Sequence, residues 1–172
     1  RALREKDPDL TQADANSAAW RQGVRLLKRA IQEGLDCTFE TTLGGNTITS
    51  LLMQAAEQGI EVHVWYVGLS SPELHIERVQ ARVSWGGHDI PEHDIHRRYE
   101  HSRLNLIALL PRLTSLHVYD NSTDADPAAG RTPRLMPVLH MKRAKIIGPP
   151  DLAATPNWAK PIVAAALKLS QP

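Results

Sequence analysis

Apolar residues recur at helical spacing near the start of the chain. One face carries Trp20, Val24, Leu27 and Ile31, while basic and polar residues occupy the other faces. This stripe predicts an amphipathic helix over residues 17–34, because a surface helix buries one face and leaves the rest in water. A glycine ends this pattern, and residues 37–39 have the composition of a short buried strand.

Farther along, strand-like and helix-like patterns alternate. Residues 60–69 are rich in β-branched and aromatic side chains, which is typical of a strand, and residues 115–119 form another such segment. Periodicity and capping residues predict helices over 46–59, 72–84 and 91–111. The alternation predicts an α/β fold with a mainly parallel sheet flanked by helices, in which ligands bind at the carboxyl ends of the strands.

The pattern loosens after residue 122. A polar linker comes first, and residues 135–147 read as one or two edge strands because Pro137 interrupts the run. A last helix is predicted over residues 156–169, with Trp158 in its apolar stripe. We therefore expect an α/β domain over residues 1–122, followed over 123–172 by a linker, edge strands and a helix of unknown role.

Composition narrows the functional classes. The 172 residues are 42% hydrophobic and carry a net charge of +1, so no basic field extends over the whole chain and we expect neither a nucleic-acid nor a membrane partner. No apolar run approaches the ~18 residues of a membrane span. The single cysteine, Cys37, rules out a disulfide framework within the chain and suits a cytoplasmic location.

Glu40 and Thr42 follow the strand predicted over residues 37–39. At a strand end, the carboxylate of Glu40 can orient a substrate hydroxyl or a magnesium-bound water, and the hydroxyl of Thr42 can bind an oxygen atom. A structural interpretation stays open, in which Glu40 simply enters solvent and Thr42 caps a turn.

Arginines gather on the two helices predicted over residues 72–111. Arg78 and Arg82 share a face of the first helix, and Arg97, Arg98 and Arg103 lie on the returning helix. A helical hairpin would aim these guanidinium groups into one cleft, as a phosphate clamp requires, because the planar fork of arginine binds phosphate oxygens in pairs. The alternative is a solvated helix pair stabilised by ion pairs with its own acidic residues.

Two further features leave alternatives open. Five histidines lie between residues 75 and 101, and the spacing of His93 and His96 resembles that of metal ligands. A metal-dependent hydrolase is conceivable on this ground, although a polar lid rich in histidine explains the pattern better. Asn121 follows the strand over residues 115–119 and is suited either to binding a nucleotide base or to pinning the turn.

Four segments together resemble the zeta-toxin-like P-loop kinases, also described as predicted ABC-type ATPases. These segments read FETTLGG, YVGLSSPEL, RVSWGGHDIPEHDIHRRY and YDNS, and the resemblance covers about residues 1–122. It implies a nucleotide-kinase-like fold with a lid over about residues 72–111. It also implies ATP and Mg²⁺ as cofactors, transfer of the γ-phosphoryl group to a small-molecule acceptor such as a nucleotide sugar, and an antitoxin protein as a partner.

The resemblance also assigns roles to residues. Glu40 and Thr42 look like the strand-end carboxylate and hydroxyl that face substrate and magnesium, and Arg82, Arg97 and Arg98 look like the lid arginines that neutralise the transferring phosphoryl group. We therefore predict Glu40 and these three arginines as catalytic. Thr42 and Arg78 are predicted to bind substrate and Asn121 to bind the cofactor, while no metal-ligating residue is predicted.

One departure from the family pattern affects the functional prediction. The family carries G-x-x-x-x-G-K-[ST] and an acidic residue ahead of the segment that opens here at Arg1, and neither occurs in these 172 residues. We interpret the chain as lacking its native amino terminus. The alternative is a degenerate, non-catalytic binding or regulatory module that has kept the lid but not the phosphate loop.

Overall fold

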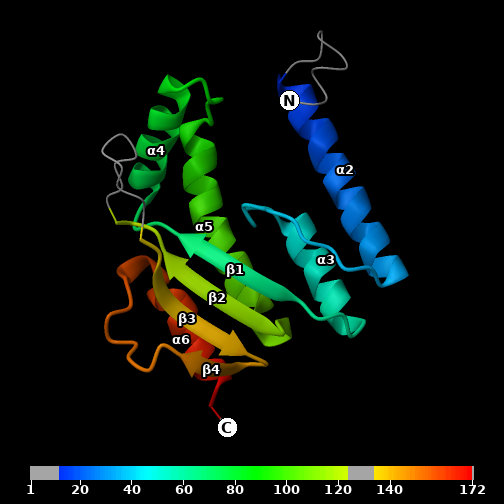
Figure 1. The fold of residues 1–172 in the computed structure, drawn as a ribbon, viewed down its shortest axis with the longest axis vertical. Coiled ribbons are helices and arrows are strands. Elements are labelled where there is room, and N and C mark those ends of the chain that lie inside the picture. Colours follow the sequence, from blue (N-terminus) through cyan, green and yellow to red (C-terminus); the bar gives the residue numbers. More distant parts are fainter. Residues whose placement is uncertain (1–11, 124–133, 172) are drawn as a thin grey trace. The chain divides into compact units, whose positions relative to one another are not determined.

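The computed structural model describes residues 12–123 and 134–171 (Figure 1). The chain divides into two compact units between Glu40 and Thr41, and each unit is described by itself. The first unit contains helix α2 (Gln12–Glu33), which confirms the helix predicted over residues 17–34. Gly34 follows it with a φ of 63°, the left-handed conformation that commonly ends a helix.

The strand predicted over residues 37–39 does not form, so that prediction is wrong. Residues 35–44 belong to no helix or strand, and none of the strands in the described part of the chain pairs with them. A strand requires a neighbour to pair its backbone N–H and C=O groups, and apolar composition alone does not supply one. Glu40 and Thr42 are therefore not at a strand end.

The second unit holds a four-stranded sheet and its helices. Along the chain come α3 (Asn46–Glu57), β1 (His63–Gly68), α4 (Pro72–Ser84), α5 (Glu92–Leu109), β2 (Ser115–Asp120), β3 (Met136–Lys142), β4 (Lys145–Gly148) and α6 (Lys160–Leu169). Short 3₁₀ turns cover Leu110–Arg112 and Asn157–Ala159. This order confirms the predicted alternation of strands and helices, and no helix in the described ranges is both long and apolar enough to cross a membrane.

The sheet is mixed, which corrects the prediction of a mainly parallel one. Its order is β1-β2-β3-β4, with β1 and β2 parallel and the other two pairs antiparallel. β3 and β4 form a hairpin whose two loop residues, Arg143 and Ala144, have φ values of 46° and 63°. One or two edge strands are predicted from residues 135–147, whereas the structure has two strands there, of which only β4 lies at the edge. Composition does not encode the direction in which such strands run.

One hydrophobic core joins the C-terminal segment to the rest of the second unit. The largest fully buried side chains come from α5, β2, β3 and α6, and they are Leu106, Leu109, Leu116, Val118, Leu139 and Ile162. Burying each of these side chains contributes about 1.5–3 kcal/mol. α6 contacts both α5 and β4, so residues 136–169 complete the core rather than trail from it.

Helices α4 and α5 pack side by side as a hairpin, as predicted (Figure 1). The hydroxyl of Ser71 caps α4 by accepting a hydrogen bond from the N–H of Leu74 at 3.3 Å, and Pro72 occupies the first turn. At the other end, the N–H of Gly87 donates to the carbonyl of Arg82 at 3.0 Å. The hairpin thus begins immediately after β1, and its base lies beside the carboxyl end of that strand.

Candidate functional site

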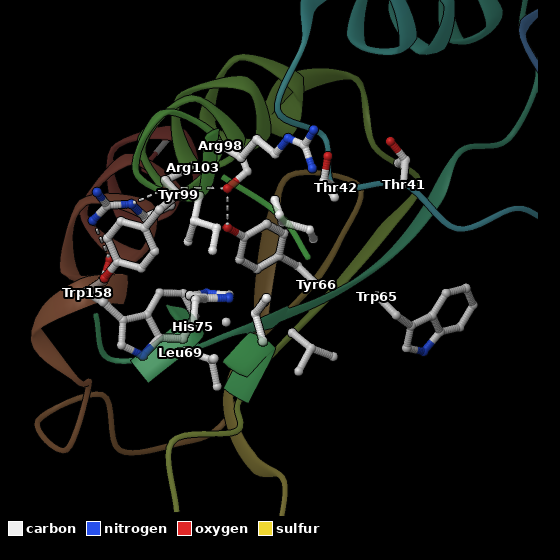
Figure 2. Close-up of a pocket in the computed structure, with 16 residues that line it drawn as sticks. Thr41, Thr42, Trp65, Tyr66, Leu69, His75, Arg98, Tyr99, Arg103 and Trp158 are labelled. Carbon is white, nitrogen blue, oxygen red and sulfur yellow. Dashed lines mark hydrogen bonds between the residues drawn. The ribbon is translucent and has the colours of Figure 1, made fainter. Parts of the chain in front are cut away.

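A cavity of about 280 Å³ lies where β1 ends, bounded by α4, α5, the loop before α3 and Trp158 (Figure 2). The end of β1 is tied to the end of its parallel neighbour, because the N–H of Asn121 donates to the carbonyl of Gly68 at 2.9 Å. The carboxyl ends of parallel strands are the usual ligand-binding edge of α/β sheets. The predicted position of the ligand site is therefore consistent with this cavity, although only one strand pair is parallel.

One end of the cavity is polar and cationic. Thr41, Thr42 and Arg98 line it, and Figure 2 shows the guanidinium of Arg98 beside Thr42. None of the sixteen described residues that line the cavity is acidic. An anionic group that enters would therefore meet two threonines and a guanidinium, with no carboxylate among the residues that line the cavity.

The loop that carries the two threonines is anchored to α5. The side-chain amide of Asn105 donates to the carbonyl of Leu43 at 2.8 Å, and the N–H of Leu43 donates to Oγ1 of Thr41 at 3.1 Å. Leu43 itself is buried and has a φ of 52°. A Cβ on Gly44 would lie 2.8 Å from Cγ of Arg98, so the loop approaches the arginine as closely as a glycine allows.

Arg98 is only loosely paired with an acidic side chain of the protein. Its guanidinium lies 3.9 Å from a carboxylate oxygen of Asp94, whereas that of Arg97 lies 2.5 Å from the other oxygen. Asp94 is therefore neutralised mainly by Arg97. The side chain of Arg98 keeps donors that a ligand in the cavity can use.

Aromatic side chains form the other end of the cavity. Tyr66 shares a hydrogen bond of 2.9 Å with Ser102, and burial raises the pKa of the Tyr66 hydroxyl, so it stays protonated. His75 meets the ring of Tyr99 edge to face at 5.8 Å. Burial, with the nearby charge of Arg78 second, lowers the pKa of His75, so its imidazole is neutral at neutral pH.

Arg103 also lines the cavity, but its guanidinium is already held in place. It lies over the ring of Tyr99 at 4.3 Å from the ring centre and donates to the carbonyls of Tyr99 and Trp158, at 3.1 and 3.4 Å. A cation over an aromatic face is stabilised by the ring quadrupole. Arg103 thus connects α5 to the wall that Trp158 forms.

Trp158 closes the aromatic end. Its indole N–H donates to Oδ1 of Asp120 at 3.1 Å, and its six-membered ring lies so close to Gly68 that a Cβ there would be 2.2 Å from it. The same carboxylate oxygen accepts hydrogen bonds from the N–H and the hydroxyl of Ser122. These contacts fix the indole as a rigid wall of the cavity.

The structure brings two of the predicted site residues, Thr42 and Arg98, into the cavity. Arg78, Arg82 and Arg97 do not line it and have partners within the second unit: Arg78 donates to the carbonyls of Asn121 and Thr123, Arg82 donates to that of His88, and Arg97 pairs with Asp94. Glu40 ends the first unit, and its role stays a prediction.

Asn121 has a buried side-chain oxygen with no hydrogen-bond partner among the described residues. Its backbone carbonyl, in contrast, accepts a hydrogen bond of 2.8 Å from Arg78. A buried acceptor without a donor is costly, so this oxygen is suited to a donor that the described residues do not supply. Cofactor binding by Asn121 stays a prediction.

Sequence reasoning missed much of the aromatic end. The sequence predicts Tyr66 only as part of a strand, His75 only as one of five clustered histidines, and Trp158 only as part of the apolar stripe of a helix. No local signal identifies them, because their association depends on the sheet bringing residues 66–69, 75 and 158 together. Ser102 offered one hint, since a buried hydroxyl on an otherwise apolar helix face requires a partner.

The described residues do not fit the cofactors that the predicted function needs. No group of three or more His, Cys, Asp or Glu side chains is placed to hold a metal ion within the described ranges. The 172 residues contain no glycine-rich loop followed by Lys-Ser or Lys-Thr, which would cradle nucleotide phosphates. No step through Mg²⁺ or ATP is therefore derived from these residues.

Comparison with known proteins gives a family and one relative. A family model described as Zeta toxin matches residues 1–126. An uncharacterized protein of Haemophilus influenzae (strain ATCC 51907 / DSM 11121 / KW20 / Rd) is 34% identical over 97 residues, which cover 56% of this chain and 66% of that protein. The chain thus spans just under two thirds of the length of this relative. No solved structure matches the chain significantly.

Proposed function

The chain belongs to the zeta toxin family, and from that premise we propose that its cavity is the acceptor site of an ATP-dependent phosphotransferase. Family membership by itself suggests a kinase-like, nucleotide-dependent function. The acceptor is a small anionic molecule, and a nucleotide sugar is the class that the resemblance of the sequence implies.

The observation that carries the proposal is the cationic end of the cavity. Arg98, Thr41 and Thr42 converge there, and no acidic residue is among the described residues that line it. Arginine binds two phosphate oxygens at once and keeps its charge at any physiological pH, while threonine hydroxyls donate to a third oxygen. This combination favours an anionic ligand over a neutral or cationic one.

In the proposed reaction these residues position the acceptor and stabilise charge. Arg98 binds the anionic group, Thr42 orients it, and Arg103 adds a second positive charge farther in. The resemblance of the sequence alone proposes Glu40 as the carboxylate that orients the acceptor hydroxyl. Phosphoryl transfer relies mainly on positioning and on cations near the equatorial oxygens, so a site of this kind is chemically sufficient on the acceptor side.

A second candidate function is a non-catalytic module that binds the same anionic ligand. It is favoured by the cationic lining of the cavity, which supplies the contacts that binding an anion needs whether or not the ligand is turned over. The two candidates share the cavity and differ only in whether the ligand is turned over.

Two measurements separate these possibilities, the first on the 172-residue chain and the second on the complete protein. NMR titration with inorganic phosphate and with UDP-glucose tests the anion site, and we expect Arg98→Ala to weaken binding about 10- to 100-fold, because a charge-assisted hydrogen bond contributes about 1.5–3 kcal/mol. Transfer of ³²P from γ-labelled ATP to UDP-glucose tests catalysis.

The control is Arg97→Ala, which removes the neighbouring arginine that does not line the cavity. Equal weakening by both variants, or none by either, would contradict the anion site. Binding that depends on Arg98 without any ³²P transfer would favour the non-catalytic module.

A further inference from the structure

His75 differs from the other polar side chains at the aromatic end of the cavity, because the polar groups of those side chains already have hydrogen-bond partners in the protein. The hydroxyl of Tyr66 bonds to Ser102, that of Tyr99 donates to the carbonyl of Ser70 at 3.0 Å, and the indole N–H of Trp158 donates to Asp120. In the part of the chain that the structure describes, no residue forms a hydrogen bond with either ring nitrogen of His75.

The ring of His75 is nevertheless held in position. It lies in the first turn of α4, where its backbone N–H donates to the carbonyl of Ser71 at 3.4 Å, and it meets Tyr99 edge to face. Figure 2 shows it between Tyr66 and Trp158, inside the cavity. A fixed side chain with an unused donor and an unused acceptor is prepared for a ligand rather than for a protein partner.

Burial, with the nearby charge of Arg78 second, lowers the pKa of His75 and keeps its imidazole uncharged at neutral pH. Arg78 lies one turn farther along α4 and Arg103 faces the cavity from α5, while the two tyrosines nearby are neutral. No acidic residue among those that line the cavity opposes these cations. A neutral imidazole donates from one nitrogen and accepts at the other, which matches a hydroxyl group, and it has no positive charge with which to attract a second anion.

We propose that His75 is a specificity-determining residue, which hydrogen-bonds to a hydroxyl on the uncharged ring of the substrate while Arg98 holds its anionic group. Tyr99 and Trp158 form the walls against which that ring packs. The inference rests on the proposed function, since it assigns the other end of the same substrate. It predicts that the site prefers a hydroxylated ring over an apolar ring of the same size.

The preference has a simple physical origin. An apolar ring that fills this end of the cavity removes water from His75 without replacing the hydrogen bonds that water made. Leaving a buried donor or acceptor unsatisfied costs more than a hydrogen bond gains, so discrimination comes mainly from rejecting the wrong ring. Arg98 contributes equally to both ligands and therefore sets affinity rather than preference.

Two phosphate esters with six-membered rings test the inference on the 172-residue chain. Glucose 1-phosphate carries hydroxyls and cyclohexyl phosphate does not, while both carry the same anionic group. We expect His75→Phe to weaken binding of glucose 1-phosphate about tenfold, which corresponds to about 1.4 kcal/mol. Binding of cyclohexyl phosphate should change by less than about twofold, and His75→Gln, which keeps a donor and an acceptor, should restore most of the difference.

A second measurement needs no variant. In the parent chain, the ¹⁵N resonances of the His75 imidazole should shift on titration with glucose 1-phosphate and stay in place with cyclohexyl phosphate. Equal effects of His75→Phe on both esters, or equal ¹⁵N shifts, would overturn the role of His75 and leave the proposed function standing, provided that Arg98→Ala weakens both. If the parent chain bound neither ester, the proposed function would fail, and this inference with it.

Discussion

The two ends of the α4–α5 hairpin use the same residue types for different purposes. At the hairpin tip, which we define as residues 82–97, Arg82 donates to the carbonyl of His88 and Arg97 pairs with Asp94. At the hairpin base, residues 98–103, Arg98 faces the threonine loop and Arg103 lies over Tyr99. Arg97 and Arg98, adjacent in sequence, therefore differ in how closely the carboxylate of Asp94 already pairs with them.

This difference separates stability from binding. A satisfied arginine on an exposed surface contributes about 0–1 kcal/mol and little else. An arginine that borders a cavity without a strong ion pair keeps its capacity for a ligand. The arginine count of a segment is thus a weaker guide to a phosphate site than the partners of each arginine.

The largest expected effect is on the free energy of unfolding. It contrasts Trp158, which contacts Arg103 of the hairpin base, with Trp85 at the hairpin tip. Trp158→Ala, beside the hairpin base, should lower the free energy of unfolding by about 3–5 kcal/mol, because it leaves a cavity beside Gly68 and removes one hydrogen bond to Asp120. Trp85→Ala at the tip, where the side chain is 73% exposed, should change it by about 0.5 kcal/mol or less. Urea unfolding followed by circular dichroism measures both, and a similar loss in the two variants would contradict the contrast.

The next effect concerns turnover. If Arg98 also reaches the transferring phosphoryl group, as the resemblance of the sequence implies, Arg98→Ala should lower kcat in ³²P transfer by the complete protein by about 10²-fold, because a lost transition-state charge contact costs about 3 kcal/mol. Arg97→Ala should have a clearly smaller effect. Equal losses would mean that the tip folds over the ligand during the reaction and that Arg97 acts there, as the sequence suggested.

A smaller effect should follow from moving Arg98 rather than removing it. Gly44→Ala places a methyl group against the side chain of Arg98, and we expect roughly threefold weaker binding of phosphate because the guanidinium is displaced. Gly45→Ala is the matched control, since a Cβ there has no atom within 4 Å. Unfolding curves should be similar for the two variants, and a loss of binding with Gly45→Ala would show that the loop, rather than Arg98, is responsible.

The smallest effect is in the pH dependence of stability. The pKa of His75 is lowered in the folded chain, so the unfolded chain binds more protons below its ordinary value of about 6.5, and stability should fall as the pH drops from about 7 to 5. His75→Phe should reduce this slope without abolishing it, because burial also lowers the pKa of His117. An unchanged slope in thermal unfolding measured across this range would contradict the assignment.

Much of the second unit could be predicted from sequence because its signals are local. Ser71 and Pro72 mark the start of α4, and the β-branched run over residues 60–69 contains β1. Where the prediction failed, the missing information was a distant partner. Residues 37–39 have strand composition, but no strand in the described part of the chain pairs with them. β3 runs antiparallel to β2, and the residues of β3 do not by themselves specify that direction.

The candidate site follows the same rule. Thr42 and Arg98 were predicted from a motif and from charge, and both line the cavity. Trp158 and His75 became site residues only through their approach to β1, Tyr99 and each other in the folded chain. Local pattern identified two residues that line the cavity and left the shape of the site undetermined.

The contact between Gly68 and Trp158 restricts the substitutions that these two positions can accept during evolution. The indole fills the space where any other residue at position 68 would place its first side-chain carbon, at 2.2 Å. A chain with a larger residue at position 68 therefore has to carry a smaller one at position 158, and neither change is tolerated by itself. The two positions, 90 residues apart, should be inherited as a pair, so that the C-terminal segment and the rest of the second unit cannot be exchanged freely between relatives.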